Sequence, residues 1–342
     1  MTMPLRQKQI LITGASGFIG SHLVERALSE GAVAWAAVRP TSNRRYLADP
    51  RIRFIELDLS DDYRLRAQLE QHCAEHGPWD YVVHAAGATK CRREEDFFRT
   101  NTEGTLRLAR LLAATGALRG RFVLISSLSV CGPIHETDGG LIGETDEPRP
   151  DTAYGRSKLE AERGLALMDC APDYVVLRPT GVYGPRERDY YLMARSIARH
   201  VDFAVGWRPQ VLTFIYVADL VEAAFLALER GESGRAYFLT DGGAYSSRDF
   251  SDLLGRAIGV RRVLRVRAPL WLLRAVCAVA GGWARIWGKT STLNMDKYRI
   301  MKQRNWQCDI TPARHDLGYT PRYPLARGVA ETVAWYKKEQ WL

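Results

Sequence analysis

Residues 10–20 read Ile10-Leu11-Ile12-Thr13-Gly14-Ala15-Ser16-Gly17-Phe18-Ile19-Gly20. The first four residues form an apolar run that indicates a short buried strand, and the apolar spacing over 18–30 indicates a helix. Gly14, Gly17 and Gly20 allow a tight turn, the close approach of a pyrophosphate, and close packing of the helix on the strand. The free N–H groups and the positive dipole end of the helix would face the phosphates. This stretch therefore predicts a dinucleotide-binding turn, in which Ser16, Phe18 and Ile19 accompany the three glycines.

Outward from this turn, strand and helix patterns alternate. Further strands are expected at 33–38, 54–57, 81–84, 122–126 and 174–177, with helices near 61–75, 94–115 and 152–168. Alternation of this kind implies right-handed crossovers and a parallel sheet covered on both faces, which is a doubly wound, Rossmann-type α/β fold.

The pattern becomes less regular beyond residue 180. We expect a Rossmann-type domain over 1–180 and a smaller, mixed and mainly helical substrate lobe over 181–342, interleaved with the sheet. In the second part the sequence predicts strands at 211–216 and 236–239 and helices at 217–230 and 247–258, the last with Ser246 or Ser247 as N-cap, and a helical chain from Pro269 onward.

The choice between NAD and NADP is expected at the end of the strand 33–38. An acidic residue there would bind the ribose hydroxyls of NAD, whereas an arginine favours the 2′-phosphate of NADP. The chain has Arg39 and, a little further on, Arg44, and no Asp or Glu at this position. We therefore predict a preference for NADP(H), with NAD(H) as the second cofactor. Asp58, at the end of the third strand, could accept a hydrogen bond from the adenine amine or cap a helix.

Three side chains are expected to converge beside the nicotinamide. Tyr154 and Lys158 are four residues apart and share one face of a helix, and Ser127 closes the strand 122–126. A tyrosine needs about 4 kcal/mol of preferential phenolate stabilisation to act as a base near pH 7. The Lys158 ammonium and the positive nicotinamide ring could supply it. Ser127 would then hold the substrate oxygen while Tyr154 passes the proton and a hydride moves to or from the ring.

With these motifs the chain resembles the extended short-chain dehydrogenase/reductases of the NAD-dependent epimerase/dehydratase superfamily, from Lys8 to about Tyr336. The resemblance implies that Ala85, Ala86 and Gly87 line the cofactor and that the backbone after Pro179 meets the carboxamide. It also implies a homodimer through the helices near 94–115 and 152–168. The matching pieces are the glycine turn, Asp58-Leu59, His84-Ala85-Ala86-Gly87, Asn101, Gly104-Thr105, Ser126-Ser127-Leu128-Ser129-Val130, Tyr154, Lys158 and Leu177-Arg178-Pro179.

Two branches of this superfamily compete. Nucleotide-sugar epimerases and dehydratases usually carry an Asn where this chain has Gly181, and an Arg where it has Val211-Leu212-Thr213. The run from Leu177 to Pro185 instead resembles 3β-hydroxysteroid dehydrogenases and dihydroflavonol reductases. The leading hypothesis is therefore interconversion of a secondary alcohol and a ketone on a hydrophobic substrate. The alternatives are a nucleotide-sugar epimerase or dehydratase, and a non-catalytic dinucleotide sensor.

The substrate side of the site is predicted less sharply. Gly181 and Val182 would follow the cofactor-lining Pro179, and the Trp-rich segment 269–287 could wall a pocket for a lipophilic substrate or lie on a membrane surface. The side chains expected to face the substrate are Lys90, Ser129, Cys131 and Tyr183.

The composition narrows the class of protein. The chain has 342 residues with 46% hydrophobic and 25% charged residues, an ordinary globular balance. Its six cysteines form no C-x-x-C pair, so neither a disulfide framework nor a metal site is expected. The net charge is +9, but the Lys and Arg residues are scattered along the chain and form no nucleic-acid-binding motif. No apolar signal segment follows the N-terminus. We expect a cytoplasmic protein whose partner is a small molecule.

Overall fold

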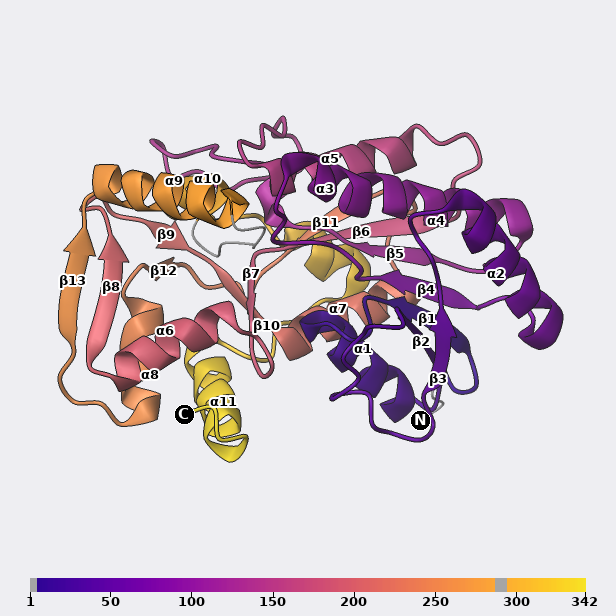
Figure 1. The fold of residues 1–342 in the computed structure, drawn as a ribbon, viewed down its shortest axis with the longest axis horizontal. Coiled ribbons are helices and arrows are strands. Elements are labelled where there is room, and N and C mark those ends of the chain that lie inside the picture. The colour runs from indigo at the N-terminus through magenta and orange to yellow at the C-terminus, as the bar shows by residue number, and fades with distance from the viewer. Residues whose placement is uncertain (1–4, 287–293) are drawn as a thin grey trace.

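The computed structural model describes residues 5–286 and 294–342 and confirms the Rossmann-type α/β fold (Figure 1). Seven strands form one sheet in the order β11-β6-β5-β4-β1-β2-β3, and every neighbouring pair is parallel. The strands are β1 (Gln9–Thr13), β2 (Val33–Val38), β3 (Arg53–Glu56), β4 (Tyr81–His84), β5 (Phe122–Ile125), β6 (Tyr174–Pro179) and β11 (Ala236–Leu239).

Helices cover both faces of this sheet because its strands are apolar on both sides. The side chains of β1 alternate, so that Ile10 and Ile12 enter one core and Leu11 enters the other. The first core includes α1 (Phe18–Ser29) and α7 (Val217–Glu229); the second includes α2 (Asp62–His76), α4 (Gly104–Thr115) and the end of α5 (Ala153–Ala166). The order of β1 next to β4 places the topological switch point, where such folds bind ligands, beside the glycine turn.

The predicted helix over 94–115 is three elements. These are α3 (Glu94–Phe97), the π-helix η1 (Phe98–Glu103) and α4. Two threonine hydroxyls form hydrogen bonds to backbone carbonyls at this π-helix. The Thr105 hydroxyl donates to the Asn101 carbonyl within the segment, and the Thr102 hydroxyl donates to the Ser157 carbonyl of α5. Such π-bulges are frequent at functional sites.

The second part of the chain combines helices with three two-stranded sheets. Residues 211–216 do not form one strand: β9 (Val211–Leu212) pairs with β12 (Tyr245–Ser246), and β10 (Phe214–Tyr216) pairs with β7 (Gly181–Tyr183). The third sheet joins β8 (Val201–Val205) to β13 (Leu264–Ala268).

The helices of this lobe surround the small sheets. They are α6 (Asp189–Ala198), α8 (Asp249–Ile258), α9 (Leu270–Ile286), α10 (Met295–Lys302), η3 (Ala313–Leu317) and α11 (Leu325–Lys338). The helix α8 begins at Asp249 and Arg248 precedes it without a side-chain cap. The predicted cap Ser246 lies two residues earlier, where its hydroxyl accepts the Arg248 N–H at 3.3 Å and its own N–H donates to the Asp249 carboxylate at 2.6 Å. The described chain is not helical throughout after Pro269, since the stretch between α10 and η3 is extended, and Trp287 lies outside the described residues.

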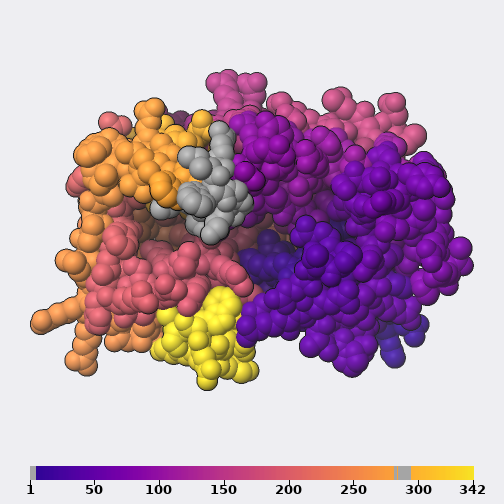
Figure 2. Space-filling view, in the orientation of Figure 1, coloured from indigo at the N-terminus to yellow at the C-terminus, as the bar shows by residue number. Residues whose placement is uncertain are grey.

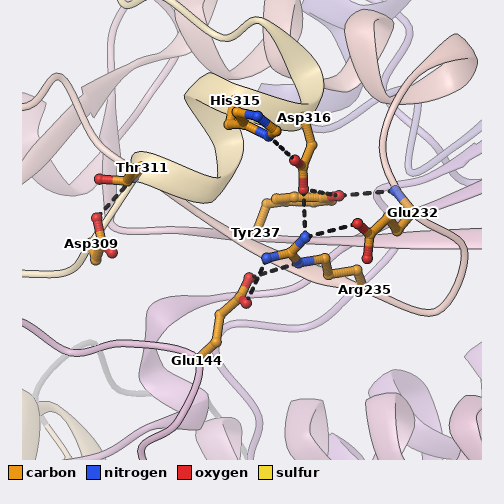
Figure 3. Close-up of polar contacts among 8 residues, drawn as sticks. All are labelled: Glu144, Glu232, Arg235, Tyr237, Asp309, Thr311, His315 and Asp316. Carbon is orange, nitrogen blue, oxygen red and sulfur yellow. Dashed lines mark hydrogen bonds and ion pairs between the residues drawn. The ribbon is translucent and has the colours of Figure 1, made fainter.

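A charged cluster joins the second part of the chain to the sheet edge (Figure 3). Arg235, beside β11, bonds both carboxylate oxygens of Glu144 at 3.1 and 3.0 Å and Asp316 of η3 at 2.6 Å. Asp316 also accepts the Tyr237 hydroxyl at 3.0 Å. The cluster therefore fixes the C-terminal segment and the loop before α5 to the last strand.

Two further observations concern membrane-spanning helices and cysteines. No helix of the described residues is long and apolar enough to cross a membrane. All six cysteines are free, and the part of the chain that the structure describes holds no group of side chains suited to a metal ion.

Candidate active site

A cavity of about 1770 Å³ runs from the carboxyl ends of the sheet strands into the second lobe. Figure 2 shows the hollow between the N-terminal part, in indigo and purple, and the C-terminal lobe. The glycine turn, the ends of β2 to β5 and the backbone after β6 line one part of this cavity, and α6, β8, β9 and α10 line the other.

The glycine turn is shaped by contact with the neighbouring strand. Gly14 has φ +67°, and a Cβ there would lie 2.7 Å from the backbone of Ala85 and Ala86. A Cβ on Gly20 would lie 2.1 Å from the Gly14 carbonyl oxygen. Gly17 is the N-cap of α1 and has no side chain to occupy the helix N-terminus. These residues, with Ser16, Phe18 and Ile19 on the cavity wall, fit a pyrophosphate as predicted for a dinucleotide site.

A buried histidine holds the turn and β4 together. His84 Nδ1 lies 2.8 Å from the Thr13 hydroxyl, and His84 Nε2 lies 3.0 Å from the Thr105 hydroxyl. Complete burial lowers the pKa of His84 to about 3, so the ring is neutral at physiological pH. Thr13 also accepts the Ala86 N–H at 3.2 Å, which fixes the backbone that faces the cofactor groove.

Of the residues predicted to bind the ribose and the adenine, some line the cavity and one does not. Arg39, Asp58 and Leu59 line the cavity, and the Asp58 carboxylate stays ionised because hydrogen bonds from Ser60 lower its pKa. Arg44 does not line the cavity: its guanidinium lies 4.6 Å from the centre of the Phe54 ring. Cation–π stacking places the Arg44 guanidinium over this ring, and its contact with the cofactor stays a prediction.

Two of the three predicted catalytic side chains, Ser127 and Tyr154, meet on the cavity wall. Tyr154 is only partly buried as a residue, but its hydroxyl lies in a desolvated environment that raises its pKa, and a hydrogen bond with Ser127 opposes this shift. We expected Lys158 and the nicotinamide ring together to lower this pKa; Lys158 is not among the groups that shift it here, and burial raises it. The phenol is therefore held in its protonated form.

Lys158 lies behind the wall rather than on it. Its ammonium donates to the Ile125 carbonyl oxygen at 2.9 Å, and burial lowers its pKa to about 8. A Cβ on Gly87 would lie 3.2 Å from Lys158 Nζ, so the backbone of the predicted cofactor-lining run Ala85–Gly87 passes directly beside this ammonium. Lys158 is thus positioned by the end of β5, next to Ser126 and Ser127.

Asn101 acquires a role that sequence reasoning did not supply. Its side-chain oxygen accepts the Ala88 N–H at 2.7 Å, and its amide donates to the Ala88 carbonyl and to the Ser157 hydroxyl, both at 3.0 Å. Asn101 is fully buried in η1. It therefore fixes the loop after β4 to the helix that carries Tyr154 and Lys158.

Two acidic residues support the catalytic helix, and sequence reasoning missed both. Glu162, one turn after Lys158, forms a 2.6 Å ion pair with Arg178 and accepts the Ser126 hydroxyl. Asp296, on α10, accepts the N–H groups of Ala153 and Tyr154 at 3.0 and 3.4 Å. The spacing from Lys158 to Glu162 was a usable signal, whereas Asp296 is too distant in sequence to be found by pattern.

We expect Glu162→Gln to move the alkaline limb of the activity profile to lower pH. Lysine is charged below its pKa, so a rate that needs the Lys158 ammonium falls as pH rises through about 8. The Glu162 charge raises this pKa, and its removal lowers it further. If the pKa of Lys158 falls by about one unit, the fraction of Lys158 that is charged at pH 8 falls about fivefold. Profiles of kcat/KM for both proteins measure this.

The control for this prediction is Glu160→Gln, an exposed position on the same helix. It should leave the pH profile unchanged. An unshifted profile in Glu162→Gln, with the fold intact by circular dichroism, would mean that Lys158 is not tuned by Glu162.

Of the four residues predicted to face the substrate, two line the cavity and two do not. Ser129 and Lys90 line the cavity, and Lys90 forms a 2.5 Å ion pair with Asp189. The prediction that Cys131 and Tyr183 face the substrate is wrong, because both are buried and neither lines the cavity. Tyr183 belongs to the aromatic core of the second lobe, and burial raises the Cys131 pKa to about 12. Pattern alone could not separate a core side chain from a pocket side chain.

The part of the cavity inside the second lobe is mostly apolar. Pro179, Gly181 and Val182 line the cavity where the second lobe begins, and Leu212 and Thr213 line it as well. Gly181 and Leu212 are therefore cavity positions. Apolar side chains that complete this wall include Met193, Ile197, Val205, Phe250, Met301 and Trp306.

The fold and the site together define a dinucleotide-binding enzyme of the short-chain dehydrogenase/reductase type. Residues 10–239 match the model of the NAD dependent epimerase/dehydratase family, and the chain belongs to this family.

Individual relatives differ in activity. The chain is 28% identical to a dTDP-glucose 4,6-dehydratase of Actinoplanes sp., which covers 96% of this chain and 98% of the relative. It is 25% identical to a ceramide reductase of Caulobacter vibrioides, and the aligned part covers 97% of this chain and 96% of the relative. Among solved structures, MoeE5 in complex with UDP-glucuronic acid and NAD is 27% identical, with a TM-score of 0.74 and coverage of 97% and 99%.

Proposed function

We propose that this protein interconverts a ketone and a secondary alcohol on a lipophilic substrate, with a nicotinamide cofactor as the hydride partner. The observation that carries the proposal is the apolar wall of the second lobe. Gly181 lies on the cavity wall where the nucleotide-sugar branch usually places an Asn. That branch usually places an Arg in the neighbourhood 211–213, of which Leu212 and Thr213 line the cavity here. A diphosphate would lose these polar partners, whereas an aliphatic or polycyclic group would bury apolar surface there.

The catalytic residues support reduction of a carbonyl group. NAD(P)H, when bound, supplies the hydride. Ser127 would hold the carbonyl oxygen, and Tyr154, whose pKa is raised, would donate its proton to that oxygen as negative charge develops. Lys158 would place its charge beside the cofactor-lining backbone at Gly87.

The cofactor preference remains part of the proposal. The family and neighbours such as MoeE5, crystallised with NAD, support NAD(H). Arg39, exposed on the cavity wall after β2, supports use of NADP(H) as well, because no carboxylate follows β2 to repel a 2′-phosphate.

A nucleotide-sugar epimerase or dehydratase is the second candidate, and the comparisons favour it. The dTDP-glucose dehydratase and MoeE5 both share almost the full length of this chain. The ceramide reductase, a relative with similar coverage, supports the lipophilic alternative. The 3β-hydroxysteroid dehydrogenase character and the homodimer stay predictions.

The deciding experiment compares the two substrate classes with purified protein. We expect NADH or NADPH oxidation with long-chain or polycyclic ketones, and no binding of UDP or dTDP at micromolar concentration by isothermal titration. Leu212→Arg should lower turnover of the ketone, while Leu141→Arg, an exposed leucine outside the cavity, should not. Turnover of UDP- or dTDP-glucose without ketone reduction would overturn the proposal, and NADH binding without any turnover would support a sensor.

A further inference from the structure

The segment before α10 carries an unusual charge. Residues 260–295 contain seven basic residues and no acidic residue, against a net charge of +9 for the whole chain. The segment includes β13 and α9. The basic residues are Arg261, Arg262, Arg265, Arg267, Arg274, Arg285 and Lys289.

The outer face of α9 is apolar and exposed. Trp271 and Val279 recur at helical spacing and are 71% and 70% exposed. On the opposite face, Leu273 and Cys277 are buried. An ordinary core helix would bury its large apolar side chains. An exposed apolar face of this kind is typical of a surface that binds a partner or a membrane.

The β8–β13 sheet extends this face at the start of α9. The Gly206 N–H donates to the Ala268 carbonyl at 2.9 Å, and a Cβ on Gly206 would lie 3.6 Å from Leu270, so the loop after β8 packs against the start of the helix. Trp207, the next residue, is 62% exposed. Arg267 and Arg274, on either side of this junction, are exposed as well. We call Trp207, Trp271, Val279, Arg267 and Arg274 the α9 surface.

We propose that the α9 surface binds an anionic lipid bilayer, with α9 lying in the plane of the membrane interface. Tryptophan is the side chain best suited to the boundary between headgroups and acyl chains, and each arginine near an anionic surface adds attraction. The complementary charge favours acidic phospholipids over a neutral partner. No helix of the described residues is long and apolar enough to cross a bilayer, and Leu273 and Cys277 face the protein, so α9 would lie on the membrane.

The position of α9 links this surface to the cavity. Figure 1 shows α9 and α10 side by side at the top of the second lobe, and α10 supplies Lys297, Ile300 and Met301 to the cavity wall. Phe203 of β8 lines the cavity and is 66% exposed. A docked protein would therefore hold the apolar part of its cavity near the lipid. The docking goes beyond the proposed function and stands on the surface alone.

Vesicle flotation with the full chain tests the docking. We expect the protein to float with vesicles of phosphatidylcholine and phosphatidylglycerol, to float much less with phosphatidylcholine alone, and to be released by high salt. Arg267→Glu with Arg274→Glu should lower the partition coefficient about tenfold or more, because each charge near the surface is worth about fivefold. Val279→Asp, an exposed position, should lower it as well.

The matched controls lie on α2. Arg66→Glu and Tyr63→Asp change a half-buried arginine and an exposed aromatic residue there, and both should float like the unaltered protein. Melting curves establish that every variant is folded. Absence of flotation with the anionic vesicles, or flotation that the α9 variants leave unchanged, would overturn the proposal.

Coverage by a second copy of the chain is the competing outcome. If light scattering shows a dimer that Val279→Asp dissociates, and the unaltered protein does not float, α9 is a protein interface and the membrane proposal fails. Flotation uses neither substrate nor cofactor, so its failure is distinguishable from a failure to reduce ketones.

Discussion

Tyr154→Phe should lower kcat by about a thousandfold and leave the Kd for NADH within about twofold of the unaltered protein, since proton transfer by a positioned side chain contributes about 10²–10⁴. The substitution removes only the hydroxyl that meets Ser127 at the cavity wall and keeps the ring that packs near Phe97. Substrate and cofactor can therefore still bind. Steady-state kinetics on the substrate found by screening, with a fluorescence titration of NADH, measure both quantities.

Tyr183→Phe is the matched control. This tyrosine lies in the second lobe, but its side chain is buried in the aromatic core and its hydroxyl faces the Leu325 carbonyl oxygen at 3.5 Å. Its removal should leave kcat within about twofold, because the long hydrogen bond is weak. A Tyr154→Phe protein that retains a tenth or more of the activity would show that another group supplies the proton.

The sheet could be predicted because buried parallel strands are continuous apolar runs. The predicted strands 33–38, 81–84 and 236–239 agree with β2, β4 and β11 at both ends. The glycine turn and the positions of Ser127 and Tyr154 followed for a related reason. Residues at the carboxyl ends of neighbouring parallel strands share one edge, so spacing along the chain translates into proximity.

The second lobe could not be predicted in the same way. The strands β8 and β13 are separated by 58 residues (206–263). The sequence of β13 alternates Leu and Val with Arg, and it becomes a strand only when β8 pairs with it. Thr213 marks the point where 211–216 changes partner: it accepts the Thr180 hydroxyl at 3.0 Å and donates to the Trp306 carbonyl at 2.5 Å. Tertiary partners decide such short strands.

The fine structure of the site depended on contacts that motifs do not encode. The motif put Lys158 near Tyr154, but its ammonium is held by the Ile125 carbonyl, a backbone group that no residue type announces. Asp296 reaches the start of the catalytic helix from 142 residues further along the chain. Motif spacing therefore predicted which side chains meet, and long-range packing decided how each is held.

The largest expected effect on the cofactor site comes from Gly14→Ala, and Gly116→Ala is its control. Both glycines have similar backbone angles, with φ +67° and +64°, which cost an alanine about 1–2 kcal/mol. At Gly116, which ends α4, nothing lies within 4 Å of a Cβ, so only that conformational cost applies. At Gly14 the Cβ would lie 2.7 Å from the backbone of Ala85 and Ala86, which cannot rotate away.

Relief of this contact must move the glycine turn or the end of β4, and both line the cofactor groove. We therefore expect Gly14→Ala to lower the free energy of unfolding by about 2–5 kcal/mol, since overpacking adds about 1–3 kcal/mol to the conformational cost. The Kd for NADH should rise at least about tenfold, because the displaced amides no longer meet the pyrophosphate. Gly116→Ala should bind NADH normally. Urea unfolding and NADH titration of both variants measure these effects. Equal losses of stability with unchanged NADH binding would mean that the contact with Ala85 does not shape the turn.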